Sequence, residues 1–251
     1  MSDKALAAQY DEMARRIFVR DGLVLSYTDN ISSRAAEMLK KLVEPSDGSM
    51  LAEAEVLPFG DELEGLRIDG DTGYSETVAA LPEGYAFNGA MRVAAKILSL
   101  GYLHREIREI GGAYGTRISI HPSRIITCFT YRDPTPFESL RIVRGCGEAM
   151  RTFAKSGEDL DRYIVATIAE VDPYMSPSAE ASRPVDLFLR MRTPADEELV
   201  RKQVLETERE DLLKVADMLD DQIKKANHLI VGGERQMKPL PADKVRELRS
   251  R

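Results

Sequence analysis

The apolar residues of this chain follow two different periods, and the change from one to the other marks its best-defined segment. Between residues 87 and 100, apolar side chains recur at the three- and four-residue spacing of an amphipathic helix. From residue 116 to 131, apolar and polar side chains alternate as in a pair of strands, with a turn at residues 121–123. Gly111 and Gly112 lie between the two patterns, and such a pair can end a helix and adopt a positive φ. The segment therefore predicts a helix that reverses into a β-hairpin.

The same two periods predict a sheet covered by helices along the rest of the chain. Capping boxes, in which Thr is followed three residues later by Glu, are predicted at residues 135–138 and 207–210. Together the elements predict an α/β (α+β) fold, with a mostly antiparallel sheet of about five strands and helices packed mainly on one face. Besides the hairpin, the predicted strands are 23–27, 66–68, 76–81 and 228–231, and helical patterns cover 3–20, 35–42, 87–107, 136–155, 160–168 and 212–223.

The length of 251 residues predicts one domain with a short appendage. The domain is predicted over residues 1–235 and begins with a leading helix at 1–20. Residues 45–65 are rich in Pro, Gly, Ser and acidic side chains, which predicts a loop. Residues 236–251 are polar and predict a fraying tail.

Charge and hydropathy exclude some classes of partner. The net charge is −7 and the basic residues are spread along the chain, which argues against a nucleic-acid partner. No run of about 18 apolar residues exists, so no membrane partner is expected. Cys128 and Cys146 fall in a predicted strand and a predicted helix, which favours reduced core thiols. The N-terminus lacks the layout of a secretory signal. Together with reduced thiols, this absence predicts a cytoplasmic protein, although a fragment would hide any signal peptide.

Few residues offer metal or nucleophile chemistry. The histidines are His104, His121 and His228, and none lies in HExxH, HxxEH or a Cys/His cluster. Because a zinc site needs three or four ligands, no metal and no other cofactor is predicted in this chain. Each histidine is instead interpreted as a surface or helix-face residue. The run at 111–115 reads GGAYG, but it has the spacing of no phosphate-binding loop and follows a helix rather than a strand.

Arg108 and Tyr114 remain as candidates for function. They stand just before and just after the two glycines, so the reversal of the backbone can bring a guanidinium and a phenol to one edge. A structural alternative is equally open at this point. Arg108 is also a cation that a helix C-terminus favours, and Tyr114 also fits a packed aromatic residue.

Three ordered motifs give the chain a family resemblance. Residues 107–115 read IREIGGAYG, residues 129–134 read FTYRDP, and residues 163–177 read YIVATIAEVDPYMSP. In order and spacing they resemble the last domain of the insulinase/pitrilysin-type zinc peptidases, and most of all the presequence protease branch. The likeness extends from about Thr77 to Val231 and, less clearly, back to Leu23.

The chain departs from the family pattern in three ways. His104 stands where the family often has Trp, and Thr130 replaces the usual Ser. The zinc-binding HxxEH motif is absent. In the family this motif lies in the first of four related α/β domains, and the present chain is long enough for about one.

The resemblance implies a fold like that of a mitochondrial processing peptidase domain and a role in a zinc-dependent oligopeptidase. Such enzymes enclose an unfolded peptide between two halves, and zinc is expected in the N-terminal catalytic half of the full-length enzyme. From this chain, Arg108 and Tyr114 would contact the substrate and the oxyanion. The loop beside them would consist of Gly111, Gly112, Ala113 and Gly115. The chain alone is expected to be inactive.

Two other hypotheses for the function of the chain stay open. The chain could be a stand-alone peptide-binding or regulatory subunit that carries no metal. It could also be a structural scaffold in which Arg108 and Tyr114 are merely packed. If a peptide binds, the predicted strand at 117–120 or its neighbour could offer an edge to it.

Overall fold

The computed structural model describes residues 3–17, 34, 37–38, 41 and 63–247. The predicted strand 23–27, most of the helix 35–42 and most of the loop 45–65 lie outside the described residues. The chain divides into two compact units. The first combines Met1–Leu57 with Tyr174–Pro194, and the second combines Pro58–Pro173 with Ala195–Arg251. In the first unit, α1 spans Asp3–Ile17 and α7 spans Pro177–Leu189, so the predicted leading helix is present.

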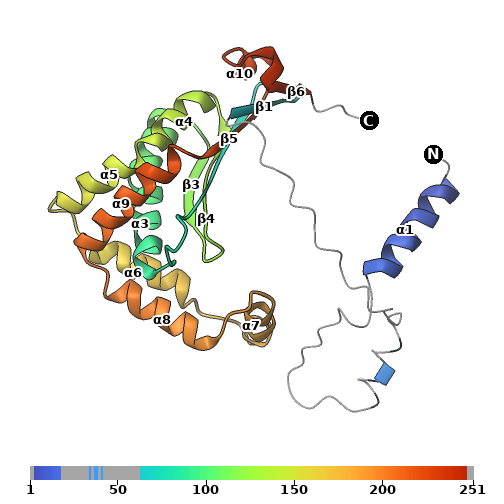
Figure 1. Ribbon diagram of the computed structural model, residues 1–251, viewed down its shortest axis with the longest axis horizontal. Helices are drawn as coiled ribbons and strands as arrows, with labels where there is room; N and C mark the ends of the chain where they lie inside the picture. Colours follow the sequence, from blue (N-terminus) through green and yellow to red (C-terminus); the bar gives the residue numbers. More distant parts are fainter. Residues whose placement is uncertain (1–2, 18–33, 35–36, 39–40, 42–62, 248–251) are drawn as a thin grey trace. The chain divides into compact units, whose positions relative to one another are not determined.

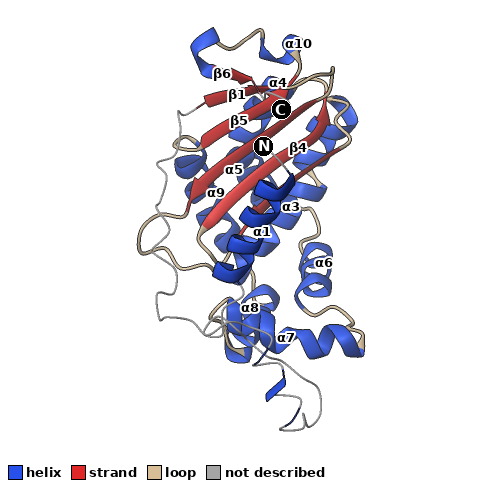
Figure 2. Cartoon of the chain, turned by 90° about the vertical axis from the view of Figure 1, so that its right-hand side faces the viewer, coloured by secondary structure: helices blue, strands red, loops and turns tan. Residues whose placement is uncertain are grey.

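The second unit is built on a six-stranded sheet with the order β3-β4-β2-β5-β1-β6 (Figure 2). The pairs β3–β4, β4–β2 and β2–β5 are antiparallel, whereas β1 runs parallel to both β5 and β6. This architecture confirms the predicted α/β class and the mostly antiparallel sheet. The strands are β1 Leu63–Arg67, β2 Gly73–Ala80, β3 Gly115–Ile120, β4 Ile125–Asp133, β5 Asn227–Gly232 and β6 Val245–Glu247.

Helices of the second unit cover one face of this sheet (Figure 1). The core lies between the two layers, where side chains from the inward positions of the strands meet the apolar faces of the helices. Met91, Leu98, Ile118, Ile126 and Leu219 are among the fully buried residues. The helices are α3 Gly89–Leu100, the π-helix η2 His104–Ile110, α4 Pro136–Arg144, α5 Cys146–Lys155, α6 Asp161–Val171, α8 Pro194–Leu205, α9 Arg209–Ile223, α10 Glu234–Met237 and the 3₁₀ turn η3 Ala242–Lys244.

Strand alternation decides which side chains enter the core. In β2, Ser75, Thr77 and Ala79 point toward the helices and are buried, while Tyr74, Glu76 and Val78 belong to the opposite face. We call that opposite face the open face, because none of the helices named for the second unit covers it (Figures 1 and 2).

Three local predictions need correction at helix ends. The Thr135 side chain makes no capping hydrogen bond; instead, the Thr135 backbone N–H donates to Oδ1 of Asp133 at 2.8 Å. The predicted helix 136–155 is broken at Gly145, where a Cβ would lie 2.6 Å from the Tyr102 hydroxyl. The second capping box is made by Glu208 and Asp211, one residue later than predicted, because the helix begins one residue later.

The segment expected to fray is part of the fold as far as Glu247. Its strand β6 pairs with β1, so that Val245 lies opposite Gly65. Met237 is buried in a small cluster with Ile230, and Leu240 and Val245 pack against it. Met237, Leu240 and Val245 are enough to pack this segment against the sheet, although its composition is polar.

Cys128 and Cys146 are buried free thiols. Burial is the main cause that raises the pKa of both, and it raises the pKa of Cys146 to about 12. Both therefore stay protonated near neutral pH, as structural cysteines do. In the described part of the chain, no helix is both long enough and apolar enough to cross a bilayer.

Candidate functional site

A π-helix and a tight turn hold the segment that the sequence singled out. In η2 the Gly111 N–H donates to the carbonyl of Glu106 at 3.0 Å, which is the i+5 bond of a π-helix. The Ala113 N–H then reaches back to the carbonyl of Ile107 at 3.0 Å, in the manner of a Schellman motif. Arg108 thus lies in the last turn of η2, and Tyr114 is the residue at which the chain leaves the turn. A single hydrogen-bonded unit fixes the backbone of both.

The two glycines serve different purposes. Gly112 has φ +79°, as the sequence predicted, whereas Gly111 has φ −77°. At Gly111 the requirement is space, because a Cβ there would lie 2.6 Å from the carbonyl oxygen of Ile107. Ala113 is buried and Gly115 begins β3 opposite Tyr131.

Gly112→Val is expected to lower the free energy of unfolding by about 1–3 kcal/mol, because a β-branched side chain is strained at positive φ. Gly157→Val is the matched control, since Gly157 has open space around its Cβ position and no positive φ. Urea unfolding of both variants measures the difference. Equal losses in the two would contradict backbone strain at Gly112.

Tyr114 lies at the end of a row of aromatic rings. Its ring is 5.8 Å from that of Tyr131, which in turn is 5.5 Å from that of Tyr74, and both contacts are edge-to-face. The Tyr114 N–H donates to the carbonyl of Tyr131 at 3.0 Å. The Tyr114 side chain is nevertheless 67% exposed, so the row orients the ring without covering it.

Arg108 is also exposed, and its guanidinium contacts a nearby side chain of the same helix, His104. Its Nη1 is 3.3 Å from Nε2 of His104, and Nδ1 of the same imidazole is 3.2 Å from a carboxylate oxygen of Glu109. Both predicted site residues are therefore accessible on one turn, and neither is buried in the core. A planar cationic donor and a neutral phenol on the same turn can donate hydrogen bonds to carbonyl oxygens and to an oxyanion.

The histidines do not form a metal site. His228 is 3% exposed in β5, with Nδ1 3.0 Å from Oγ1 of Thr77, so its interpretation as a surface or helix-face residue is wrong. Alternation places it on the inward side of the strand, next to a partner that lies far away in the sequence. Within residues 3–17 and 63–247 and the few others described, no group of three or more His, Cys, Asp or Glu residues is arranged to hold a metal ion.

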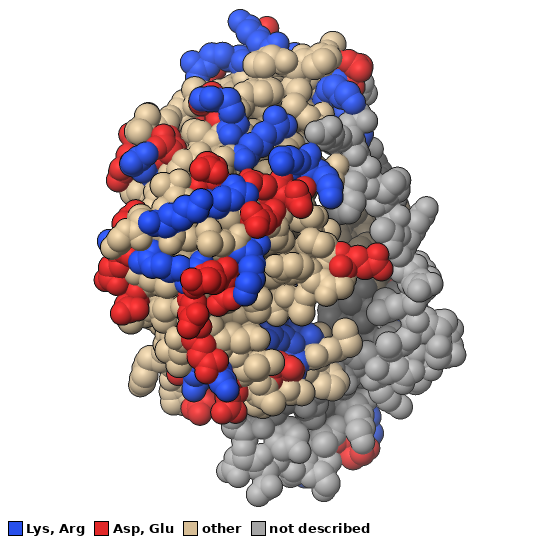
Figure 3. Space-filling view, turned by 60° about the vertical axis from the view of Figure 1, so that its left-hand side comes forward, with Lys and Arg blue, Asp and Glu red and all other residues tan. Residues whose placement is uncertain are grey.

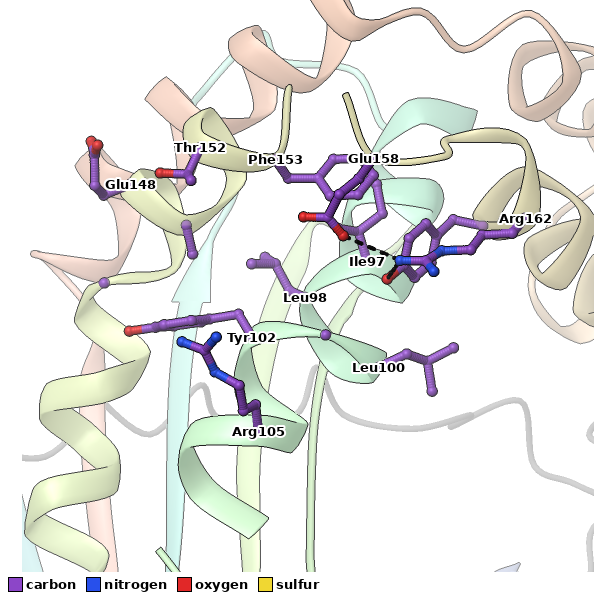
Figure 4. A pocket seen from close by; sticks show the side chains of 14 residues that line it. Ile97, Leu98, Leu100, Tyr102, Arg105, Glu148, Thr152, Phe153, Glu158 and Arg162 are labelled. Carbon is purple, nitrogen blue, oxygen red and sulfur yellow. Dashed lines mark hydrogen bonds and ion pairs between the residues drawn. The ribbon is translucent and has the colours of Figure 1, made fainter. Parts of the chain in front are cut away.

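A separate cavity of about 760 Å³ opens among the helices, and sequence reasoning missed it (Figure 4). Ile97, Leu98 and Phe153 form its apolar wall, and neither Arg108 nor Tyr114 lines it. Most of its charged and phenolic groups already have partners. The Tyr102 hydroxyl donates a hydrogen bond to the carbonyl of Ile142 at 3.0 Å. Arg105 donates to Glu106, and Arg162 donates to both Glu158 and Tyr163.

Basic and acidic side chains alternate over the helical side of the molecule instead of forming blocks of one sign (Figure 3). Arg151 of α5, for example, pairs with Asp217 of α9 at 3.0 Å and with Glu148 at 3.1 Å. The charges of this side therefore largely compensate one another.

Comparison with known proteins gives consistent results. The family described as the PreP C-terminal domain matches residues 74–233. Presequence protease 1, chloroplastic/mitochondrial, of Arabidopsis thaliana is 25% identical over 86% of this chain, and the mitochondrial presequence protease of Eremothecium gossypii is 33% identical over 57%. The chain spans only 21% and 15% of the lengths of these two relatives.

Solved structures share the fold at low sequence identity. Pitrilysin superposes with a TM-score of 0.56 at 14% identity, over 88% of this chain and 26% of its own. The inactive domain of a peptidase M16 protein from Pseudomonas fluorescens gives a TM-score of 0.52 at 16% identity, over 81% of this chain and 51% of its own.

The names of the relatives correct the predicted location. Both presequence proteases are named as organellar proteins, and this overturns the expectation of a cytoplasmic protein. The physical reason is that an organellar address resides in a separate leader. A chain that spans about a fifth of a relative gives no information on such a leader.

The family match covers more than half of the chain and includes all three motifs on which the resemblance rested, at 107–115, 129–134 and 163–177. The fold of the second unit agrees with that of solved peptidases of this type. The chain therefore belongs to the PreP C-terminal domain family.

Proposed function

We propose that this chain is the part of a zinc-dependent oligopeptidase that binds the peptide and assists the transition state. The observation that carries the proposal is the presence of an exposed guanidinium, Arg108, and an exposed phenol, Tyr114, on one hydrogen-bonded turn. Relatives that are named proteases, and of which the chain spans about a fifth, support it.

Each residue has a distinct task in this proposal. When a nucleophile attacks a peptide carbonyl, negative charge develops on the oxygen, and the Tyr114 O–H donates a hydrogen bond to it. The planar guanidinium of Arg108 binds a neighbouring carbonyl of the peptide and fixes the position of the peptide relative to Tyr114. Gly112 and Gly115 carry no side chain between the peptide backbone and the turn.

Zinc belongs to another part of such an enzyme. When bound there, it polarises the scissile carbonyl and activates water. The described residues of this chain contain no ligand set for it, and the sequence contains no HxxEH motif. In this proposal the chain supplies binding and orientation, and the attacking water comes from the catalytic half.

We expect the purified chain to bind an unfolded peptide weakly without cleaving it. Tyr114→Ala is expected to weaken this binding by about threefold to tenfold, because an aromatic side chain at an interface contributes roughly 1 kcal/mol. Tyr174→Ala is the matched control, since Tyr174 is 99% exposed and lies in the first compact unit. Fluorescence anisotropy of a labelled peptide measures both.

Two outcomes would contradict the proposal. The first is equal peptide affinity in the parent and in Tyr114→Ala. The second is peptide cleavage by the chain alone together with about one tightly held zinc per chain in metal analysis, because the chemistry would then reside here.

A further inference from the structure

The register of the strands places five side chains in a row across the open face. Arg117 of β3 lies opposite Phe129 of β4, which lies opposite Glu76 of β2. Glu76 in turn lies opposite Leu229 of β5, which lies beside Glu64 of β1. A carboxylate therefore occupies the middle of the sheet on the open face.

The surroundings of Glu76 are mostly apolar. Phe129 and Leu229 flank it across the strands and are 39% and 38% exposed. Along its own strand the neighbours on the same face are Tyr74 and Val78. Burial raises the pKa of the Glu76 carboxyl above its ordinary value, so the site is drier than an ordinary surface position.

The other two charged residues of the row each have a partner of opposite charge. Glu64 forms an ion pair with Arg246 at 3.2 Å, and Arg117 lies 3.7 Å from Glu170 of α6, a carboxylate that it shares with Lys96. Among the described residues, no hydrogen bond or ion pair joins the Glu76 side chain to a partner. A half-buried carboxylate without a cation is unfavourable by itself, and a cation brought by a ligand would relieve that cost.

We propose that the open face binds a peptide segment whose Lys or Arg side chain pairs with Glu76, while apolar residues on either side of that cation rest on the neighbouring rings. This rests on the proposed peptide-binding function and adds a preference for basic residues to it. Tyr74 and Tyr131 would contact the peptide on one side of the cation, and Val78 on the other.

Charge argues against two other occupants of this face. In a symmetric dimer centred on Glu76, two half-buried carboxylates would face one another, which like-charge repulsion disfavours. An anionic bilayer would be repelled in the same way by Glu76 and by the net charge of −7. A basic segment flanked by apolar residues has the complementary chemistry.

The test uses the full 251-residue chain and two blocked peptides that differ at one central position. One peptide carries Lys there and the other norleucine, with Leu and Phe on both sides. At pH 7 we expect the Lys peptide to bind about tenfold more tightly, the size of one charge-assisted contact. In Glu76→Gln this preference is expected to fall to about one. Glu64→Gln is the control on the same row and should retain the preference, because its charge is already paired.

A charge exchange makes the test independent of any single variant. Glu76→Lys is expected to prefer a peptide with a central Glu over the Lys peptide. The two peptides alone also test the parent chain, even if every variant at this position failed to fold.

The outcomes separate this inference from the function on which it rests. Equal binding of the Lys and norleucine peptides to the parent would overturn the role of Glu76 and leave peptide binding intact. Failure of both peptides to bind would overturn both proposals. Dimers that form more tightly in Glu76→Gln would assign the open face to a second copy of the chain.

Discussion

Tyr114→Phe, made in a complete enzyme that carries this domain, is expected to lower kcat by about 10²–10³-fold. The substitution removes one hydroxyl and keeps the ring, so the contact with the Tyr131 ring remains. Because the proposed hydrogen bond strengthens only as charge develops on the carbonyl oxygen, KM should change much less than kcat. Steady-state kinetics on an unfolded peptide measures both constants.

Two companion variants sharpen this expectation. Tyr174→Phe removes a hydroxyl from an exposed tyrosine of the first compact unit and should leave kcat within about threefold, since Tyr174 has no proposed role. Arg108→Lys keeps the charge but loses the planar fork, and it should also lower activity. Full activity in Tyr114→Phe would remove the transition-state role and would leave Tyr114 as a contact residue only.

Ile107→Ala is expected to lower the free energy of unfolding by about 2–5 kcal/mol. Ile107 is 0% exposed in the main core, although it belongs to the same short π-helix as the exposed Arg108. Its side chain anchors η2, and its carbonyl accepts the hydrogen bond from Ala113. Removal of the anchor should therefore also loosen the turn that presents Arg108 and Tyr114.

Ile110→Ala is the matched control for that expectation. It makes the same chemical change three residues later in η2, at a side chain that is 71% exposed. The loss there should stay within about 0.5 kcal/mol. Similar losses at the two positions, measured by urea unfolding, would contradict the assignment of Ile107 as the anchor.

Local patterns in the sequence determined much of the fold. The helical period located α3, and the alternation at 116–131 located the hairpin β3–β4 with its turn. The glycine pair correctly predicted a positive φ, although only Gly112 adopts it. Such features are visible in sequence because backbone sterics and the burial of one face act on neighbouring residues.

The three motifs predicted the family and indicated Arg108 and Tyr114 as candidate site residues. Their common order and spacing are more specific than a single short motif. A leader sequence that directs a protein to its compartment is separate from a domain of this kind and does not affect the sequence of the domain. The prediction of location was wrong for that reason.

Only the tertiary structure decided how distant strands combine. Alternation shows that Glu76 and Thr77 lie on opposite faces of β2 and that His228 and Leu229 lie on opposite faces of β5, but it does not show which face the helices cover. The inward position of His228 depends on a partner 151 residues away, and the pairing of β6 with β1 joins segments 180 residues apart. Phe129 of β4 and Leu229 of β5, which flank Glu76 of β2, are brought beside it by the register of the whole sheet. Pairing of this kind is non-local, because each strand satisfies its backbone hydrogen bonds with whichever neighbour the packed core brings beside it.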